Sequence, residues 1–411
     1  MAFSKEIQIK YIDKIIFSCF IGLVFILPFA HTMSIRSVFM FLPAVLWFYK
    51  MALMRKVLFI KNPMTIPLAI FVVAAAVSLL TAVDPKYTLR ELRGEMLADF
   101  LLFFLLLNNL HDRNQVEWII ASLLAGSLAH GIYGLTQYFS NELNLFDYNI
   151  KAWGFTAGFI SYSVFLITVI PFNIYKLATE AGKKRLLAAI LLILNLFMLY
   201  AVHQRGALIA LIVQSLLFFW FSKRRLAFFL SLALIVLAIT SLPRRLIYHG
   251  EGGIDLNIKD RTQADNTVNT RVLLWKFSLK EISRRPFTGI GFGRHSFSAK
   301  YKEFKGTELW HALNTFLNIT LQLGVQGLAA FVFMLYRLIR TFWIGQKENE
   351  GARRLFYLAM VLCIIGFFVR NMFDDHYVDD NAQMLWVLMG VGMAVFLNID
   401  RLKYRGLFRE A

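Results

Sequence analysis

The feature that most constrains this chain is a series of long apolar runs separated by short polar clusters. A run of about 17 to 25 apolar residues has the length that an α-helix needs to cross a bilayer core of roughly 30 Å. Hydrophobic residues make up 58% of the 411 positions and only 17% are charged, which is too apolar for a chain whose surface must be wetted. The sequence therefore predicts an all-α integral membrane protein.

The runs predict about twelve transmembrane helices, with one long polar loop before the tenth. They cover residues 15–30, 37–49, 66–82, 96–110, 116–139, 155–175, 186–202, 207–221, 226–242, 312–343, 355–373 and 382–397. We divide the chain accordingly into transmembrane helices 1–9 in residues 1–242, a loop with amphipathic helices in residues 243–310, and transmembrane helices 10–12 with a short tail in residues 311–411.

Lys and Arg are unevenly distributed among the short loops, and their distribution indicates the orientation of the chain. The richer set comprises the N-terminus, the segments 50–61, 111–115, 176–185, 223–225 and 337–354, and the C-terminal tail. By the positive-inside rule this set faces the cytoplasm, so both termini are expected there and the long loop lies outside. In a membrane protein a net charge of +18 more often reflects such signals than nucleic-acid binding, which we do not expect.

The long loop is itself basic, which suggests an anionic partner on the outer face of the membrane. For most of its Lys and Arg residues we favour a solvated surface or contact with anionic lipid head groups. Thr270 can cap a helix that runs to Arg285 before Pro286, with Arg271 in its first turn. Four apolar residues share one face of this helix, which predicts that it lies over the bundle: Val272, Trp275, Leu279 and Ile282.

His311 stands where the long loop re-enters the membrane. On a helix it would begin a continuous polar stripe on an otherwise apolar span, made of His311, Asn314, Asn318 and Gln322. Such side chains should face the bundle interior or a wet cavity. For Asn318 and Gln322 we favour hydrogen bonds between helices. For His311, its position at the outer mouth beside a basic loop and an unperturbed pKa of ~6.5 favour proton transfer.

Arg205 lies in HQRGA, a very short outer turn between two apolar runs. An arginine in such a turn can simply extend its charged end to the membrane interface. The turn has no acidic neighbour in sequence, however, and the planar fork of guanidinium donors suits a phosphate. Arg205 is therefore a candidate phosphate ligand.

The last outer loop, VRNMFDDHYVDD, concentrates charged and titratable residues. Arg370 and Asp374 are one helical turn apart and can pair with each other. The acidic residues and His376 can instead bind a divalent cation, although their spacing matches no fixed metal loop. A third interpretation is that one of the carboxylates orients a catalytic histidine or an arginine.

Sequence patterns for nucleotide, redox or metal chemistry are missing. The segment GIGFG, residues 289–293, lacks the G-x-G-x-x-G spacing and follows no βαβ strand, so it is not a nucleotide loop. No P-loop, CxxC, zinc or GxSxG pattern is present, and Cys19 and Cys363 lie inside apolar runs as small core residues. We therefore expect no cofactor, and any chemistry must draw its energy from the substrate.

Three features together resemble the O-antigen ligase and polymerase superfamily of bacterial envelope proteins, and within it the ligases most. They are the long outer loop before the tenth of about twelve spans, R-x-x-x-W with P-x-x-G-I-G-x-G (Arg271, Trp275, residues 286–293), and H-x-x-N with L-G-x-x-G-L (His311, Asn314, residues 323–328). Many members carry H-x-H-N, whereas this chain has WHALN. His311 is therefore the only histidine candidate in that motif.

The resemblance implies transfer of a glycan from an undecaprenyl pyrophosphate carrier to a lipid A core sugar hydroxyl, at the periplasmic face of the bacterial inner membrane, in lipopolysaccharide biosynthesis. The essential arginines of the family match Arg205 and Arg271, which would stabilise the leaving pyrophosphate, while His311 would take the acceptor's proton. We expect inversion at the anomeric carbon and no metal. Expected substrate-binding residues are Asn314, Asp374, Asp375, Arg370 and Arg294; Asp374 and Asp375 are not distinguished.

Two other functions remain open at this stage. An O-antigen polymerase would use the same donor but transfer it to another lipid-linked repeat. A transporter of lipid-linked glycans also suits about twelve spans, but transporters usually bind their cargo near the membrane midplane and often show internal repeats, neither of which is evident here. Membrane lipids are expected partners, and the choice between monomer and homodimer is undecided.

Overall fold

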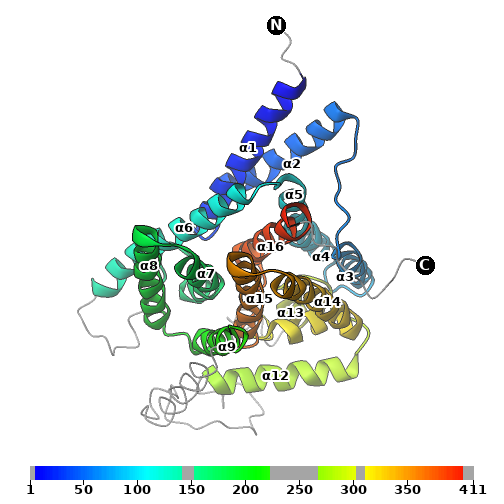
Figure 1. The fold of residues 1–411 in the computed structure, drawn as a ribbon. Coiled ribbons are helices and arrows are strands. Elements are labelled where there is room, and N and C mark those ends of the chain that lie inside the picture. Colours follow the sequence, from blue (N-terminus) through cyan, green and yellow to red (C-terminus); the bar gives the residue numbers. More distant parts are fainter. Residues whose placement is uncertain (1–4, 141–151, 223–266, 302–310, 401–411) are drawn as a thin grey trace.

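The computed structural model describes residues 5–140, 152–222, 267–301 and 311–400, and every regular element in them is helical (Figure 1). The longer helices are α1 (Lys5–Ile26), α2 (Met33–Met54), α3 (Thr65–Val77), α5 (Leu97–Asn109), α6 (Arg113–Phe139), α7 (Phe159–Thr179), α8 (Gly182–Ala201), α9 (Arg205–Phe221), α12 (Thr267–Arg284), α14 (Thr315–Glu348), α15 (Gly351–Asn371) and α16 (Asp379–Ala394). The short ones are η1 (Ser78–Leu80), α4 (Pro85–Glu91), the π-helical turn η2 (Leu92–Met96), α13 (Ser296–Lys300) and η5 (Val395–Ile399).

Seven of the described helices are long and apolar enough to cross a membrane. They are α2, α6, α7, α8, α14, α15 and α16 with η5, while α3 and α9 are shorter apolar helices. The protein is therefore a multi-pass, all-helical membrane protein, as the apolar runs predict. The predicted span at residues 226–242 lies outside the described residues. The count of about twelve spans and the outer placement of residues 243–310 stay predictions.

α15 and α16 occupy the centre of the bundle (Figure 1). α15 packs against α7, α9 and α14, and α16 packs against α5. The core between them contains Phe103, Phe342 and Trp386, each less than 2% exposed. α2 instead exposes apolar side chains such as Met33 and Val45, as a helix beside lipid does. The segments at the ends of α15 and α16 are thus held in the protein interior.

α14 is interrupted at Gly324, whose φ of +77° is the left-handed conformation that glycine adopts most readily. The segment 286–293 fills the break. Ile290 and Gly291 donate backbone N–H bonds to the carbonyls of Leu321 (3.0 Å) and Gln322 (3.1 Å), and Val325 donates to Pro286 O (2.8 Å). Backbone groups that leave the helix ladder inside a membrane protein need such partners. The glycine-rich turn predicted to lead the chain back therefore docks on α14.

α12 lies along one side of the bundle, against α14 (Figure 1). It begins at Thr267, so the prediction that Thr270 caps it is wrong, and Arg271 follows the first turn. The predicted inward face is also wrong in part, because Leu279 is 56% exposed. The face that packs inward carries Leu274 and Ile282, which join the small apolar cluster around Ala312, Ile290, Phe297 and Leu321. The prediction that the helix lies over the bundle is confirmed.

Candidate active site

His311 precedes α14 and does not lie on it, so the predicted four-residue helical stripe is wrong at its start. The helix begins at Thr315 because Asn314 is its N-cap, with Oδ1 accepting the N–H of Leu317 (3.1 Å). The Asn314 amide also donates to Met372 O at the end of α15 (2.9 Å). Asn314 thereby fixes where His311 sits relative to α15.

His311 is only 4% exposed, and each of its ring nitrogens lies within hydrogen-bonding distance of a neighbouring nitrogen. Nδ1 accepts the N–H of Leu313 (3.1 Å), and Nε2 lies 2.9 Å from Nη2 of Arg294. Burial and the charge of Arg294 lower the pKa of His311 to about 4, although Asp375 and Asp374 oppose the shift. The imidazole is therefore neutral at pH 7, the state that a base requires.

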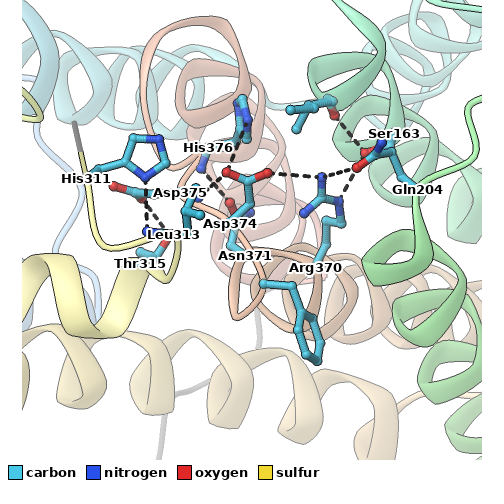
Figure 2. A network of polar contacts seen from close by, with 12 residues as sticks. Ser163, Gln204, His311, Leu313, Thr315, Arg370, Asn371, Asp374, Asp375 and His376 are labelled. Atoms are coloured by element: carbon cyan, nitrogen blue, oxygen red, sulfur yellow. Dashed lines mark hydrogen bonds and ion pairs between the residues drawn. The ribbon is translucent and has the colours of Figure 1, made fainter. Parts of the chain in front are cut away.

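Asp374 and Asp375 have different environments (Figure 2). Asp375 accepts hydrogen bonds from Thr315 (2.7 Å) and Asn318, both near the start of α14. Asp374 accepts the N–H of Asp375 (2.9 Å) and lies 3.7 Å from Nε2 of His376. Asp375 thus holds α14 beside His311, whereas Asp374 faces the opposite side of the loop.

Arg370 pairs with Asp374 at 3.5 Å, as their spacing in the sequence suggests (Figure 2). Arg370 is 1% exposed and also donates to Ser163 Oγ (3.0 Å) and Gln204 (3.4 Å). Burial alone would raise the pKa of Asp374, but the positive charges of His376 and Arg370 outweigh it and lower the pKa to about 2. Arg370 therefore joins α15 to α7 and to the start of α9, and keeps Asp374 ionised.

Arg205 and Arg271, which are far apart in the sequence, lie close enough to influence each other. Arg271 on α12 donates from Nε to Phe373 O at the end of α15 (2.9 Å). Burial lowers the pKa of Arg271, the charge of Asp374 opposes that shift, and the charge of Arg205 adds to it. Two cations held together beside one carboxylate are suited to a multiply charged anion.

A cavity of about 1150 Å³ opens at this end of the bundle. Of the predicted site residues, Arg271, Arg294, His311 and Asp374 line it. Arg205, Arg370, Asn314 and Asp375 are not among its lining residues, and the last three lie behind it with the bonds described above. The lining comes from the α1–α2 connection, the start of α2, η2, the starts of α7, α12 and α16, the segment after α15, and the segments that carry Arg294 and His311.

Several lining residues were not among the predicted site residues: Arg36, Ser37, His376, Asp379, Asp380, Asn381 and Gln383. For His376, Asp379 and Asp380 the sequence signal was the clustering of charge in the last outer loop. The other residues gave no signal, because isolated polar residues at a helix end are common near a membrane interface. Within the described residues, no group of three or more His, Cys, Asp or Glu has a geometry that could hold a metal ion. The absence of a metal from the reaction stays a prediction.

The fold and the cavity define a class of protein, a multi-pass helical membrane protein with a cavity at one end of its bundle that is lined by arginine, aspartate and histidine side chains. Residues 188–332 match the family model described as O-antigen ligase. This match and the two relatives below confirm the resemblance to the O-antigen ligase superfamily.

The chain is similar to a Rickettsia bellii protein named "Putative polysaccharide ligase", 30% identical over 132 residues, which are 29% of this chain and 30% of the relative. It is also similar to an O-antigen ligase of Salmonella typhimurium, 25% identical over 338 residues, or 77% of this chain and 80% of the relative. The match to the rickettsial protein thus spans less than a third of that protein's length.

Proposed function

We propose that the protein is an O-antigen ligase, which transfers a glycan from undecaprenyl pyrophosphate to a sugar hydroxyl of the lipid A core at the periplasmic face of the inner membrane. The observation that carries the proposal is that His311, Arg271 and Arg294 line one cavity, with Arg205 near Arg271. A neutral base beside several cations suits a donor whose leaving group is an anion. The names of the relatives support the same class of reaction.

In the proposed reaction the acceptor oxygen attacks the anomeric carbon of the donor glycan. The bond between that carbon and the pyrophosphate oxygen breaks, its electron pair leaves with the pyrophosphate, and His311 takes the proton of the acceptor hydroxyl. Arg271 and Arg205 stabilise the charge that develops on the leaving group. Attack opposite the leaving group inverts the configuration, and no metal ion is required.

The buried position of His311 links its basicity to donor binding. In the free protein its pKa is lowered, in part by the positive charge of Arg294. A pyrophosphate beside Arg294 adds negative charge, which offsets that cation and favours the protonated imidazole. The pKa of His311 therefore rises when the donor binds, and the residue becomes a stronger base when its substrate is in place.

α2 and α7 contribute apolar side chains to the cavity beside their polar ones. These apolar lining residues are Met33, Met40, Phe41, Ile160 and Phe165. A polyprenyl chain needs an apolar path between the membrane and the reacting end, because its transfer to water is unfavourable in proportion to its apolar area. These apolar lining residues support a lipid-linked donor over a water-soluble one.

The first test uses the purified protein with lipid-linked glycan and lipid A core isolated from cells that lack the gene. We expect His311→Ala to reduce transfer by about 10²- to 10⁴-fold, the usual contribution of a general base. His295→Ala is the matched control, because His295 is exposed, does not line the cavity and should leave transfer unchanged. Near-normal turnover by a folded His311→Ala protein would remove His311 from the mechanism.

The product and the response to a chelator separate the remaining alternatives. A ligase attaches the glycan to lipid A core, whereas a polymerase lengthens the lipid-linked glycan and needs no lipid A core. We expect activity to survive a chelator. Loss of activity with chelator, followed by recovery with a divalent cation, would contradict the metal-independent mechanism.

A further inference from the structure

Arg271 and Arg294 form one polar wall of the cavity, called here the arginine wall, and a second polar wall is acidic. Asp379, Asp380, Asn381 and Gln383, in the first turns of α16, line it together with Ser37 of α2. Asp380 forms an ion pair with Arg36 of α2, which ties the two helices together at the cavity. This wall carries carboxylate and amide groups, and its one cation is paired.

The amide side chains on this wall have unused hydrogen-bonding capacity. Within the described part of the chain, neither Asn381 nor Gln383 forms a side-chain hydrogen bond, and both are half-buried. An amide can donate two hydrogen bonds and accept two more. Residues that line a cavity with such capacity are the usual means by which a pocket orients a polar ligand.

Electrostatic neighbours connect this wall to His311. Arg294 contacts His311 and also influences Glu95, which lies in the π-helical turn η2 beside the cavity-lining Gly94. Burial raises the pKa of Glu95 to about 8, with a further contribution from Asp379 and opposition from Arg294. Arg294 thus contacts His311 on one side and interacts electrostatically with Glu95 on the other, and Glu95 in turn interacts with Asp379. The wall that carries Asp379 is therefore close to the arginine that contacts His311.

The two walls sort the two substrates by charge. A pyrophosphate is repelled by Asp379, whereas Arg271 and Arg294 outnumber the carboxylate of Asp374 on their side of the cavity, so the donor's leaving group belongs there. A sugar carries hydroxyl groups, which donate to carboxylates and both donate to and accept from amides. The α16 wall is therefore matched to a hydroxyl-rich glycan and the arginine wall to an anion.

We propose that Asp379, Asn381 and Gln383 form the acceptor subsite, which binds hydroxyl groups of the acceptor glycan and presents one of them to His311. This inference rests on the proposed function, because it names the site of the second substrate of that reaction. The Arg36–Asp380 ion pair joins α2 and α16 beside this subsite.

Binding of free oligosaccharide tests the subsite without turnover. The probe is the core oligosaccharide released by mild acid from lipid A core of cells that lack the gene, titrated against the protein in detergent. We expect the double variant Asn381→Ala with Gln383→Ala to raise its Kd about tenfold, the effect of one to two hydrogen bonds. Asn114→Ala is the control, because Asn114 is exposed at the start of α6 and does not line the cavity; it should leave the Kd unchanged.

Kinetics distinguish failure of this inference from failure of the proposed function. The double variant should raise the KM for lipid A core while the KM for the lipid-linked donor stays at the wild-type value. An unchanged acceptor KM and Kd, or a donor KM that rises instead, would overturn the acceptor subsite although the wild-type protein still transfers glycan. A wild-type protein that transfers no glycan to lipid A core would refute the proposed function itself.

Discussion

His311 shows how strongly burial changes the pKa of a side chain that the sequence already identifies as a candidate. In the sequence, His311 has an ordinary histidine pKa of ~6.5. In the fold, Arg294 from a different segment contacts its Nε2 and the backbone N–H of Leu313 meets its Nδ1. Burial and the charge of Arg294 lower the pKa of His311, so the free protein holds this histidine neutral over the physiological range.

The pH dependence of activity follows from that shift. The neutral imidazole is the active form, so activity falls as the pH drops through the pKa of His311. For kcat/KM, which reports the free protein, the acid limb should follow the pKa of about 4. For kcat, which reports the complex, the limb should lie at a higher pH because the bound pyrophosphate offsets Arg294.

Steady-state rates measured from about one pH unit below the pKa of about 4 up to pH 8 check this prediction. His295→Ala is the control: its exposed imidazole also titrates, but it does not line the cavity, so both acid limbs should stay where they are. A single acid limb near ~6.5 in both kinetic parameters would mean that His311 behaves as an exposed histidine, contrary to its position in the fold.

At the scale of elements, the glycine-rich turn and the interrupted helix α14 depend on each other. A Cβ added at Gly289 would lie 1.9 Å from the carbonyl oxygen of Gln322 and 2.4 Å from its carbon. Both are backbone atoms, so no side-chain rotation relieves the overlap. The turn leads directly to Arg294, which contacts His311. The close approach at Gly289 therefore positions part of the candidate site.

Gly289→Ala should destabilise the protein by at least about 1–3 kcal/mol, the usual range for overpacking, and lower transfer activity further. Thermal unfolding in detergent, at one scan rate because such unfolding is often irreversible, measures the first effect. Gly158→Ala is the control, since nothing lies within 4 Å of a Cβ at that position. Equal melting temperatures for the two variants would show that the turn moves away from α14 without cost.

At the scale of the whole molecule, the bundle gathers the candidate site at one end. The end of α15 and the starts of α7, α14 and α16 all meet the cavity region. Consecutive helices that cross a membrane alternate in direction, so these termini are expected on the same side. The distribution of Lys and Arg predicts that this side is the outer one.

Labelling of single cysteines from one side of the membrane tests that orientation. Cys19 and Cys363 are both buried, so the native protein provides a background that an impermeant thiol reagent should not modify. Ser283→Cys on α12 should react in intact spheroplasts, whereas Glu348→Cys, at the end of α14, should react only after permeabilisation; both positions are exposed. The reverse pattern would place the cavity in the cytoplasm and contradict the proposed donor.

Local patterns in the sequence predicted the membrane class and most helices in the described residues. They also identified His311, Arg271 and Arg205 as candidate site residues. Hydropathy and short motifs can do this because they depend on residues that are neighbours in the sequence. Only the tertiary structure separated Asp374, which lines the cavity, from Asp375, which binds the start of α14. It also brought Arg294 to His311. Burial and charge proximity depend on residues that are distant along the chain, and no local pattern encodes them.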